Sequence, residues 1–492
     1  MGIVKMENLL DKIFKAYDIR GIVGTGFDEE TARDIGKGLA YTVFKHQSPI
    51  VISKDARSHS EKLTNALIQG LNNAGCSTIE IGLASTPMNY WANIFFKAAG
   101  SVQVTASHNG PEYNGFKVSR ENTLPVGYDD GLKEVLDFIK AKRLNSSTYY
   151  SQFIKEASNK GNNKIVENSL HEYMNFMQGF ISPIETKFSN TDSATEDNWP
   201  NKKLKLVVDC GNGMAGHFMP LFEQLNPNLK IIPLYWELDG NFPNHPPDPT
   251  KEVNLQSLKN RVLEEKADFG VAFDGDADRC VFIDENGVFI SGDLIIALFA
   301  EYFSSKKVGE KILYDLRSSA IVSEFITEIN GIPIPCRVGH SYMKKMLREE
   351  KAIFGGELSG HYYFADCFNT DSALRALIQL INILRNNNKK LSELIQKFRK
   401  YFSSNEVNFK VFNSQKIMIE IEEKFSTECV EKNHLDGLSM RFQNWWFNLR
   451  QSNTEPLLRL TLESSTKEIT ETQFHNMSEL IQTISTLNEK AS

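Results

Sequence analysis

The chain has 492 residues, of which 41% are hydrophobic and 24% are charged, which is ordinary for a globular protein of three or four domains. Its 55 Lys and Arg against 62 Asp and Glu give a formal net charge of −7. That balance argues against a broad surface for nucleic acid or anionic membrane, so we expect neither kind of partner.

The amino-terminal segment lacks the long apolar region of a signal peptide, and Met6 breaks the myristoylation pattern. No window approaches 18 consecutive apolar residues. The six cysteines form no CxxC pair, which indicates reduced structural thiols. We therefore expect a cytoplasmic protein.

Strand-like and helix-like segments alternate through most of the chain. A helix is predicted over 28–45, and Ser58 is predicted to cap a second helix that ends near Gly75. Strands are predicted over 50–53, which lies between these helices, and over 78–81, 101–105, 205–209, 269–273, 311–314 and 352–354. Such alternation with helices of about 10–15 residues indicates βαβ units and largely parallel sheets.

Polar stretches divide this pattern. Residues 145–164 resemble a linker and residues 187–203 a surface loop, and a third break falls at 386–390. After it, antiparallel strands are expected around 407–412, 417–421 and 457–462, before a terminal helix from about Thr472. We predict three similar α/β domains with mixed, largely parallel sheets, at 1–160, 161–289 and 290–395, and a smaller α+β domain at 396–492.

Ligands bind in the loops that follow strands in open α/β sheets. Ser107 follows the strand predicted over 101–105, and small neighbours would leave its hydroxyl exposed near His108, Asn109 and Lys117. An isolated Ser-His-Asn is most often a loop serine that bonds its own backbone. A serine hydrolase is a second interpretation, but no G-x-S-x-G elbow is present.

Three carboxylates follow the apolar strand predicted over 269–273. Asp274, Asp276 and Asp278 are separated by Gly and Ala, so a curved loop can point all three inward. Such a set suits a hard divalent cation, most often Mg²⁺. A solvated acidic loop is the alternative, weakened because unpaired charge beside a buried strand is costly. Arg279 next to the cluster indicates that the site also handles an anion.

Three further segments offer polar side chains. Glu357 and Ser359 lie two residues apart and suit two neighbouring sugar hydroxyls, although a turn with a surface glutamate is an equal alternative. A lone histidine such as His340 is more often structural than catalytic. Arg450 opens the segment Arg-Gln-Ser-Asn-Thr-Glu-Pro, whose donors suit a phosphate cradle, and a polar turn closed by proline is the equal alternative there.

Together these loops resemble the α-D-phosphohexomutase family, specifically its phosphomannomutase/phosphoglucomutase branch. The resemblance runs from about residue 12 to residue 465, in the family's order. The matching motifs are Lys15-Ala-Tyr-Asp-Ile-Arg-Gly21, Thr105-Ala-Ser-His-Asn109, Asp274-Gly-Asp-Ala-Asp-Arg279, Gly339-His-Ser341, Gly356-Glu-Leu-Ser-Gly-His361 and Arg450-Gln-Ser-Asn-Thr-Glu-Pro456.

The resemblance implies four domains around one central active-site cleft. It also implies an isomerase of carbohydrate metabolism that interconverts hexose 6-phosphate and hexose 1-phosphate, of mannose, glucose or both. The route is a phosphoserine enzyme and a hexose 1,6-bisphosphate intermediate. Implied cofactors are Mg²⁺ and glucose 1,6-bisphosphate or mannose 1,6-bisphosphate, and the partners are small sugar phosphates. We expect a monomer, with a dimer as the alternative.

The resemblance also implies residue roles. Ser107 would carry the phosphoryl group and join Asp274, Asp276 and Asp278 as a metal ligand. Arg279 would pair with the phosphate, and His108 and Lys117 are candidates for proton handling. The substrate-binding residues would be Tyr17, Arg20, His340, Glu357, Ser359, His361, Arg450, Ser452, Asn453 and Thr454.

Departures and alternatives qualify this assignment. Gly110 stands where the family usually has proline, which loosens the backbone beside Ser107. A phosphoglucosamine or phospho-N-acetylglucosamine mutase usually carries Ser-Gly-Thr-Glu-Pro in the last loop, so Asn453 favours the mannose/glucose branch. A non-catalytic sugar-phosphate-binding relative would have lost Ser107 or an aspartate. The sugar and phosphate loops argue against a Mg²⁺-dependent phosphatase with an aspartyl nucleophile.

Overall fold

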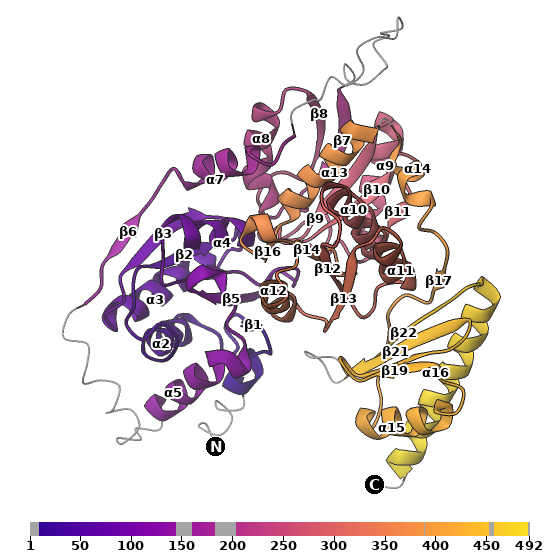
Figure 1. Ribbon diagram of the computed structural model, residues 1–492. Coiled ribbons are helices and arrows are strands. Elements are labelled where there is room, and N and C mark those ends of the chain that lie inside the picture. The colour runs from indigo at the N-terminus through magenta and orange to yellow at the C-terminus, as the bar shows by residue number, and fades with distance from the viewer. Residues whose placement is uncertain (1–8, 144–159, 183–202, 388, 452–456, 491–492) are drawn as a thin grey trace, which may run out of the picture.

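The computed structural model describes residues 9–143, 160–182, 203–387, 389–451 and 457–490. Four sheets follow one another along the chain, and each is the centre of one unit (Figure 1). The predicted fold class, three α/β units with mixed sheets and a smaller α+β unit at the carboxy terminus, is confirmed. The domain limits given above stay predictions.

The first unit is built on a mixed six-stranded sheet of order β1-β5-β4-β2-β3-β6. Its strands are β1 (Ile19–Ile22), β2 (Ile50–Lys54), β3 (Thr78–Leu83), β4 (Gly100–Val104), β5 (Tyr113–Arg120) and β6 (Asn163–Ile165). Its helices are α2 (Glu29–Gly38), η1 (Leu39–Val43), α3 (Ser60–Asn73), α4 (Thr86–Phe95), η2 (Glu121–Thr123), η3 (Tyr128–Leu132) and α5 (Lys133–Arg143).

Successive side chains of β2 point to opposite faces of this sheet. Ile50 and Ile52 pack in one core with residues of α2, α3 and α5, whereas Val51 packs in another with residues of α4. This period of two is the reason that a continuous apolar strand needs helices on both faces.

Two details of the first unit differ from expectation. Ser58 does not cap α3, because that helix begins at Ser60 after His59 and has no side-chain cap. The predicted linker over 145–164 lies outside the described residues up to position 159. Its last residues begin β6, which pairs in parallel with β3.

The second unit has a five-stranded sheet of order β11-β10-β9-β7-β8, in which β10 is antiparallel to both of its neighbours and the other pairs are parallel. Its strands are β7 (Leu204–Asp209), β8 (Leu229–Leu234), β9 (Phe269–Phe273), β10 (Cys280–Asp284) and β11 (Phe289–Ile290). Its helices are α7 (Ser169–Gln178), α8 (Ala215–Leu225), η4 (Glu252–Leu255) and α9 (Gln256–Glu265). The loop predicted over 187–203 lies outside the described residues, except for its last position.

The third unit repeats this plan with the order β13-β12-β14-β15-β16. Its strands are β12 (Lys311–Asp315), β13 (Ile332–Cys336), β14 (Phe354–Gly356), β15 (Tyr362–Phe364) and β16 (Thr370–Asp371). Its helices are α10 (Gly292–Lys306), α11 (Ala320–Glu328), α12 (His340–Glu349), η5 (Ala365–Cys367), α13 (Ala373–Asn387) and α14 (Leu391–Gln396).

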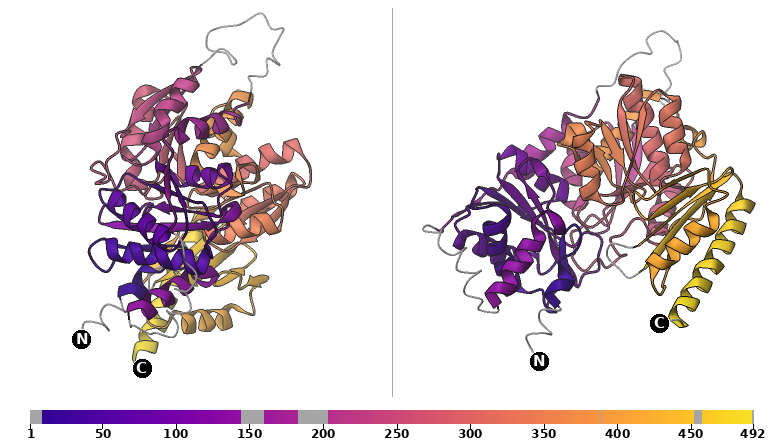
Figure 2. Two further views of the ribbon diagram at one scale, coloured as in Figure 1. Left: turned by 90° about the vertical axis from the view of Figure 1, so that its left-hand side faces the viewer. Right: turned by 60° about the horizontal axis from the view of Figure 1, so that its bottom comes forward.

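The fourth unit is an antiparallel sheet with α15 and α16 along it, seen on the right of Figure 1 and turned forward in Figure 2. Its strands are β17 (Phe402–Ser403), β18 (Val407–Phe409), β19 (Glu431–Asn433), β20 (Leu438–Arg441), β21 (Trp445–Gln451) and β22 (Leu458–Ser464). Its helices are α15 (Ser414–Phe425) and α16 (Lys467–Lys490).

The strand predicted over 417–421 is wrong, because these residues lie in α15. Ile417 and Ile421, four positions apart, are both buried, whereas Ile419 is 51% exposed. That is helical spacing, and the Asn413 side chain caps the helix by accepting from the Lys416 N–H at 3.1 Å.

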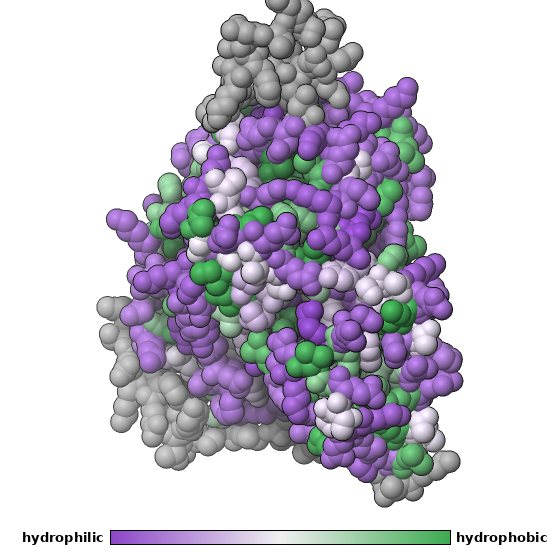
Figure 3. All heavy atoms as spheres, turned by 45° about the vertical axis from the view of Figure 1, so that its right-hand side comes forward, coloured by the Kyte–Doolittle hydropathy of each residue, from purple (hydrophilic) through white to green (hydrophobic). Residues whose placement is uncertain are grey.

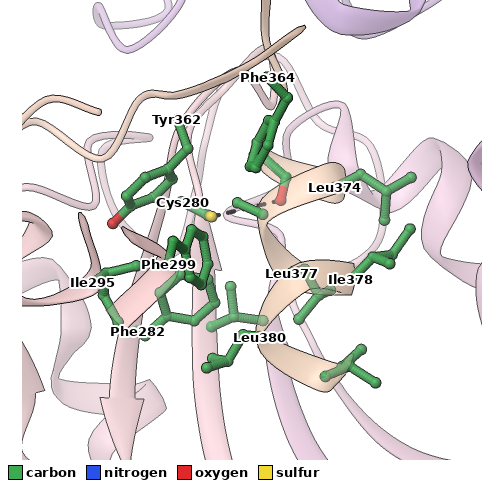
Figure 4. Close-up of a cluster of buried hydrophobic side chains, with 14 of the residues drawn as sticks. Cys280, Phe282, Ile295, Phe299, Tyr362, Phe364, Leu374, Leu377, Ile378 and Leu380 are labelled. Carbon is green, nitrogen blue, oxygen red and sulfur yellow. Dashed lines mark hydrogen bonds between the residues drawn. The ribbon is translucent and has the colours of Figure 1, made fainter. Parts of the chain in front are cut away.

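The first three units share one hydrophobic core, beside smaller cores of their own, and the fourth unit has a separate core. Figure 4 shows part of the shared core, where Phe299 of α10 and Leu377 of α13 converge on the second and third sheets. Cys280 lies there, with its thiol donating to the Ala373 carbonyl at 3.6 Å. The first three units are therefore packed as one body.

The outer face shown in Figure 3 is mostly hydrophilic, with hydrophobic residues in small scattered groups. Within the part of the chain that the structure describes, no helix is both long enough and apolar enough to span a bilayer.

Candidate active site

Two loops of different units meet backbone to backbone. One follows β4 and carries Ser107, and the other joins β9 to β10 and carries the three aspartates. A Cβ atom at Gly275 would lie 2.4 Å from the Ser107 carbonyl oxygen, so only glycine fits there. The Thr86 N–H at the start of α4 donates to the Asp276 carbonyl at 3.0 Å. The first and second units are thus joined at the ends of β4 and β9.

Ser107 is buried at this junction. Its hydroxyl donates to Asp274 Oδ2 at 3.0 Å and lies 3.3 Å from His108 Nδ1. The expectation of an exposed hydroxyl is wrong, because the aspartate loop covers the residue and leaves it 1% exposed. Its φ of 50° is left-handed, a conformation that non-glycine residues adopt rarely. The loop therefore holds Ser107 in a strained geometry that aims Oγ at the aspartates.

The three aspartates converge as predicted from their spacing. Asp274, Asp276 and Asp278 are each at most 1% exposed, and one oxygen of each lies within 4.8 Å of the others. Asp274 Oδ1 accepts from the N–H groups of Asp278 and Arg279, each at 3.1 Å. Among the described residues, none donates a hydrogen bond to Asp276 Oδ1. Clustered buried carboxylates with such an oxygen fit a hard divalent cation.

Lys117, on β5, supplies positive charge from the protein itself. Its Nζ donates to Asp276 Oδ2 at 2.6 Å and also to Asp278 Oδ2. Burial alone would raise the pKa of Asp278, but Lys117 and then His361 hold the pKa of that carboxyl well below its usual range. Burial, and after it the charge of Asp278, raises the pKa of Asp274 well above its usual range.

Arg279 and His361 connect the aspartate loop to the third unit. Arg279 Nε lies 3.8 Å from Asp274 Oδ2 and 3.2 Å from His361 Nε2, which is 3.3 Å from Asp278 Oδ1. A neutral His361 ring accepts from the guanidinium, and a charged ring donates to the carboxylate. Burial lowers the pKa of His361, but Asp278 and Glu357 together raise it to about 9.

Glu357 follows β14 and is 2% exposed. Its Oε2 accepts from the Tyr363 hydroxyl at 2.6 Å, and its Oε1 accepts from the Gly339 N–H at 2.8 Å. Ser359 Oγ lies 3.1 Å from His361 Nδ1. Glu357 and Ser359 therefore lie beside the aspartate loop, but both are already engaged by neighbours.

The remaining predicted residues of the first and third units also come together. The Tyr17 ring lies 5.7 Å from the His340 ring, which is 6.4 Å from the His361 ring. Arg20, on β1, donates to Asn109 Oδ1 in the serine loop at 2.6 Å. Residues up to 344 positions apart are thus brought to one site.

Arg450 lies in the fourth unit, at its contact with the third. Its Nη2 donates to Glu406 Oε2 at 2.7 Å, and Arg317 Nη1 lies 3.6 Å from the same oxygen. Ser452, Asn453 and Thr454 lie outside the described residues. In the described part of the chain, the contacts of Arg450 are with this acidic group rather than with the serine loop.

Sequence reasoning missed several polar contacts of the site. The Thr86 hydroxyl donates to Asp276 Oδ2, and the Lys344 ammonium lies 3.0 Å from Asp371 Oδ1 behind His361. Ser85-Thr-Pro after β3 is a helix-start signal that marks Thr86. No comparable signal marks Lys344, which lies on the buried side of α12 between Met343 and Leu347.

The chain matches four domain families in order. Three are described as phosphoglucomutase/phosphomannomutase alpha/beta/alpha domains I, II and III, at residues 11–145, 178–287 and 291–401. The fourth is the phosphoglucomutase/phosphomannomutase C-terminal domain, at residues 380–480.

Curated relatives match over almost the whole length. A phosphomannomutase of Vibrio cholerae serotype O1 is 38% identical over 460 residues, which cover 92% of this chain and 94% of the relative. A phosphomannomutase of Methanocaldococcus jannaschii is 36% identical over 470 residues, covering 95% and 97%.

Solved structures are similar as well. A phosphoglucomutase/phosphomannomutase family protein from Burkholderia thailandensis superposes with a TM-score of 0.82 at 29% identity, covering 96% of this chain and 98% of that one. Parafusin (phosphoglucomutase) from Paramecium, in an open form, has a TM-score of 0.69 at 16% identity, covering 98% and 94%, and supports the fold alone.

Proposed function

Because this chain belongs to the phosphoglucomutase/phosphomannomutase family of the α-D-phosphohexomutase superfamily, we propose that it is a phosphohexomutase whose phosphoryl carrier is Ser107. It interconverts hexose 6-phosphates and hexose 1-phosphates, of mannose, glucose or both. The observation that carries the assignment of Ser107 is its buried hydroxyl, 3.0 Å from Asp274 and under the three converging aspartates.

Charge balance explains this set of residues. A phosphoserine carries a charge of about −1.5 to −2 near neutral pH, and three carboxylates beside it would repel it. Lys117 and Arg279 offset part of that charge from within the protein. A Mg²⁺ ion held by Asp274, Asp276 and Asp278, with an oxygen on Ser107 as a further ligand, would neutralise more and orient the phosphoryl oxygens.

The transfer itself breaks the bond between phosphorus and Ser107 Oγ and forms one between phosphorus and a sugar hydroxyl oxygen. The sugar hydroxyl loses its proton, and Ser107 Oγ regains one. We assign proton handling at Ser107 to His108, because its Nδ1 is 3.3 Å from Oγ. Lys117 Nζ is held by two aspartates and acts there as a fixed positive charge.

The product of that step is a hexose 1,6-bisphosphate, which must turn end for end before its other phosphate returns to Ser107. Glucose 1,6-bisphosphate or mannose 1,6-bisphosphate would therefore activate the enzyme. Glu357 and Ser359 would contact the sugar's O3 and O4, while Tyr17, Arg20, His340 and His361 line the site. Contacts to O3 and O4 alone would leave O2 unread, so glucose and mannose, which differ at C2, would both fit.

Arg450, with Ser452, Asn453 and Thr454, would hold the phosphate that is not reacting. Arg450 lies in the fourth unit, at its contact with the third unit through Glu406 and Arg317. The cytoplasmic location, the monomeric state and the lack of nucleic-acid or membrane partners stay predictions.

A coupled assay on glucose 1-phosphate, mannose 1-phosphate and glucosamine 1-phosphate tests the function. We expect turnover of the first, the second or both, and loss of nearly all of it in Ser107→Ala, because the carrier oxygen is gone. Ser119→Ala, at a buried serine of β5, is the matched control and should keep activity. Full turnover by Ser107→Ala would defeat the assignment, and a preference for glucosamine 1-phosphate would move it to another branch of the superfamily.

A further inference from the structure

One buried guanidinium binds the backbone of the serine loop at several points. Arg57 lies between β2 and α3 and is 3% exposed. Its Nη2 donates to the carbonyls of Ser107 at 2.8 Å and Asn109 at 2.7 Å. Its Nη1 donates to the carbonyls of Gly110 at 2.5 Å and Tyr113 at 3.1 Å. The loop from Ser107 to Tyr113 is therefore folded around this side chain.

The guanidinium is itself fixed by Asp55. Arg57 Nε donates to Asp55 Oδ2 at 3.0 Å, while Asp55 Oδ1 accepts from the Arg57 N–H at 3.1 Å and the Ser60 hydroxyl at 2.5 Å. A planar fork of donors can serve a carboxylate and several carbonyls at once, whereas the three N–H donors of a lysine ammonium all leave one nitrogen and cannot span this set. This site therefore requires arginine specifically.

The second unit also packs against Arg57. The Phe242 ring centroid lies 4.9 Å from the guanidinium carbon, and a Cβ at Gly240 would lie 2.4 Å from Arg57 Cα. Gly275 of the aspartate loop packs on the Ser107 carbonyl, the oxygen that accepts from Arg57 Nη2. The Ser107 carbonyl is thus held between the Arg57 guanidinium and the aspartate loop.

The backbone conformation of Ser107 needs support from the residues around it. Ser107 has a left-handed φ of 50°, which persists in non-glycine residues only where the surroundings hold it. Gly110, in place of the proline expected in this family, gives the loop freedom three residues later. We propose that Arg57 is a positioning residue, which holds the serine loop so that Ser107 Oγ points at the aspartates. The inference rests on the proposed function.

Arg57→Lys tests the proposal, because it keeps the charge and most of the stem but loses the fork. We expect kcat to fall by about 100-fold, the effect of a displacement of about 1 Å at a reacting group, with KM for the hexose phosphate little changed. The rate at which glucose 1,6-bisphosphate phosphorylates Ser107, followed by intact mass, should fall by the same factor.

Arg375→Lys is the matched control. Arg375 is also buried, lies over the Phe180 and Phe364 rings and donates to an aspartate, Asp366, but it lies outside the serine loop. Its variant should keep kcat and the phosphorylation rate. A merely structural role for Arg57 predicts that both variants lose folded protein alike while the folded fraction keeps normal kcat, and that result would overturn the proposal.

Should Arg57→Lys fail to fold, Asp55→Asn provides the second variant. Its amide oxygen still accepts from the Ser60 hydroxyl and the Arg57 N–H, but the charge that orients the guanidinium is gone. We expect a smaller loss of kcat with KM little changed, and wild-type kcat would overturn the inference. Wild-type protein that neither turns over sugar phosphates nor takes phosphate on Ser107 would instead overturn the proposed function.

Discussion

At the residue scale, the aspartate loop concentrates charge that the chain only partly offsets. Lys117 bonds two of the three carboxylates, while Asp276 Oδ1 receives no hydrogen bond from any residue that the structure describes. A second buried group, Asp278, His361 and Asp371, has ligand atoms equally close together. That group has two carboxylates rather than three, and Lys344 lies 3.0 Å from Asp371 Oδ1. The two groups therefore differ in their need for a cation.

We expect Mg²⁺ to bind Asp274, Asp276 and Asp278 rather than the group that contains Asp371. Mg²⁺ at about 100 times its Kd should stabilise the folded protein by about 2.7 kcal/mol in thermal unfolding, because it binds the folded state alone. Activity should be lost with EDTA and return with Mg²⁺. Asp276→Asn should remove the stabilisation, and Asp371→Asn should keep it. Equal stabilisation of wild type and Asp276→Asn would contradict the assignment of Asp274, Asp276 and Asp278 as the ligands.

Much of the site is predictable at this scale, because its serine, aspartate and glutamate motifs follow strands. Ser107 lies three residues after β4 and Asp274 directly after β9. The contacts that could not be predicted depend on packing between segments that lie far apart in the sequence. The donation from Arg57 to the Ser107 carbonyl spans 50 positions, and the one from Thr86 to Asp276 spans 190. Local pattern carries no information about such pairs.

At the element scale, most strands were predictable because they are short runs of β-branched and aromatic residues that alternate with helical segments. The strand Phe269–Phe273 has the predicted bounds, and Lys311–Asp315 differs from its prediction by one residue. The failure lies at α15, where Ile417, Ile419 and Ile421 alternate with other residues as a strand would. The structure buries the first and third and exposes the second, since a helix brings positions four apart to one face.

Alanine substitutions distinguish these two periods. Ile421→Ala should lower the free energy of unfolding of the fourth unit by about 2–5 kcal/mol, because it leaves a cavity in that unit's core. Ile419→Ala, at an exposed position, should change it by less than about 0.5 kcal/mol. Urea unfolding gives both values. Equal losses at the two positions would indicate a strand with one buried face.

At the scale of the whole molecule, the cores divide the chain unequally. Residues of the first three units share one cluster, which includes Trp91, Phe218 and Phe299. The fourth unit packs around a separate cluster and touches the third through polar contacts. These include donation from the Ala320 N–H to Glu463 and from the Val338 N–H to Asp436. The chain therefore consists of one large body and one smaller body.

Calorimetry should register this division as two unfolding transitions. Ile481→Ala, in the core of the fourth unit, should lower the temperature of the smaller transition and leave the larger one in place, because each core unfolds cooperatively. Phe299→Ala should do the reverse. One transition that both variants lower by the same amount would contradict two separate bodies.

Phosphopeptide mapping after incubation with glucose 1,6-bisphosphate and Mg²⁺ shows directly whether Ser107 carries the phosphoryl group. We predict one phosphate on the peptide that contains Ser107, and its transfer to glucose 1-phosphate in a chase. Phosphate on an aspartate, or an unphosphorylated Ser107 in protein that still turns over hexose phosphate, would show that Ser107 is not the carrier.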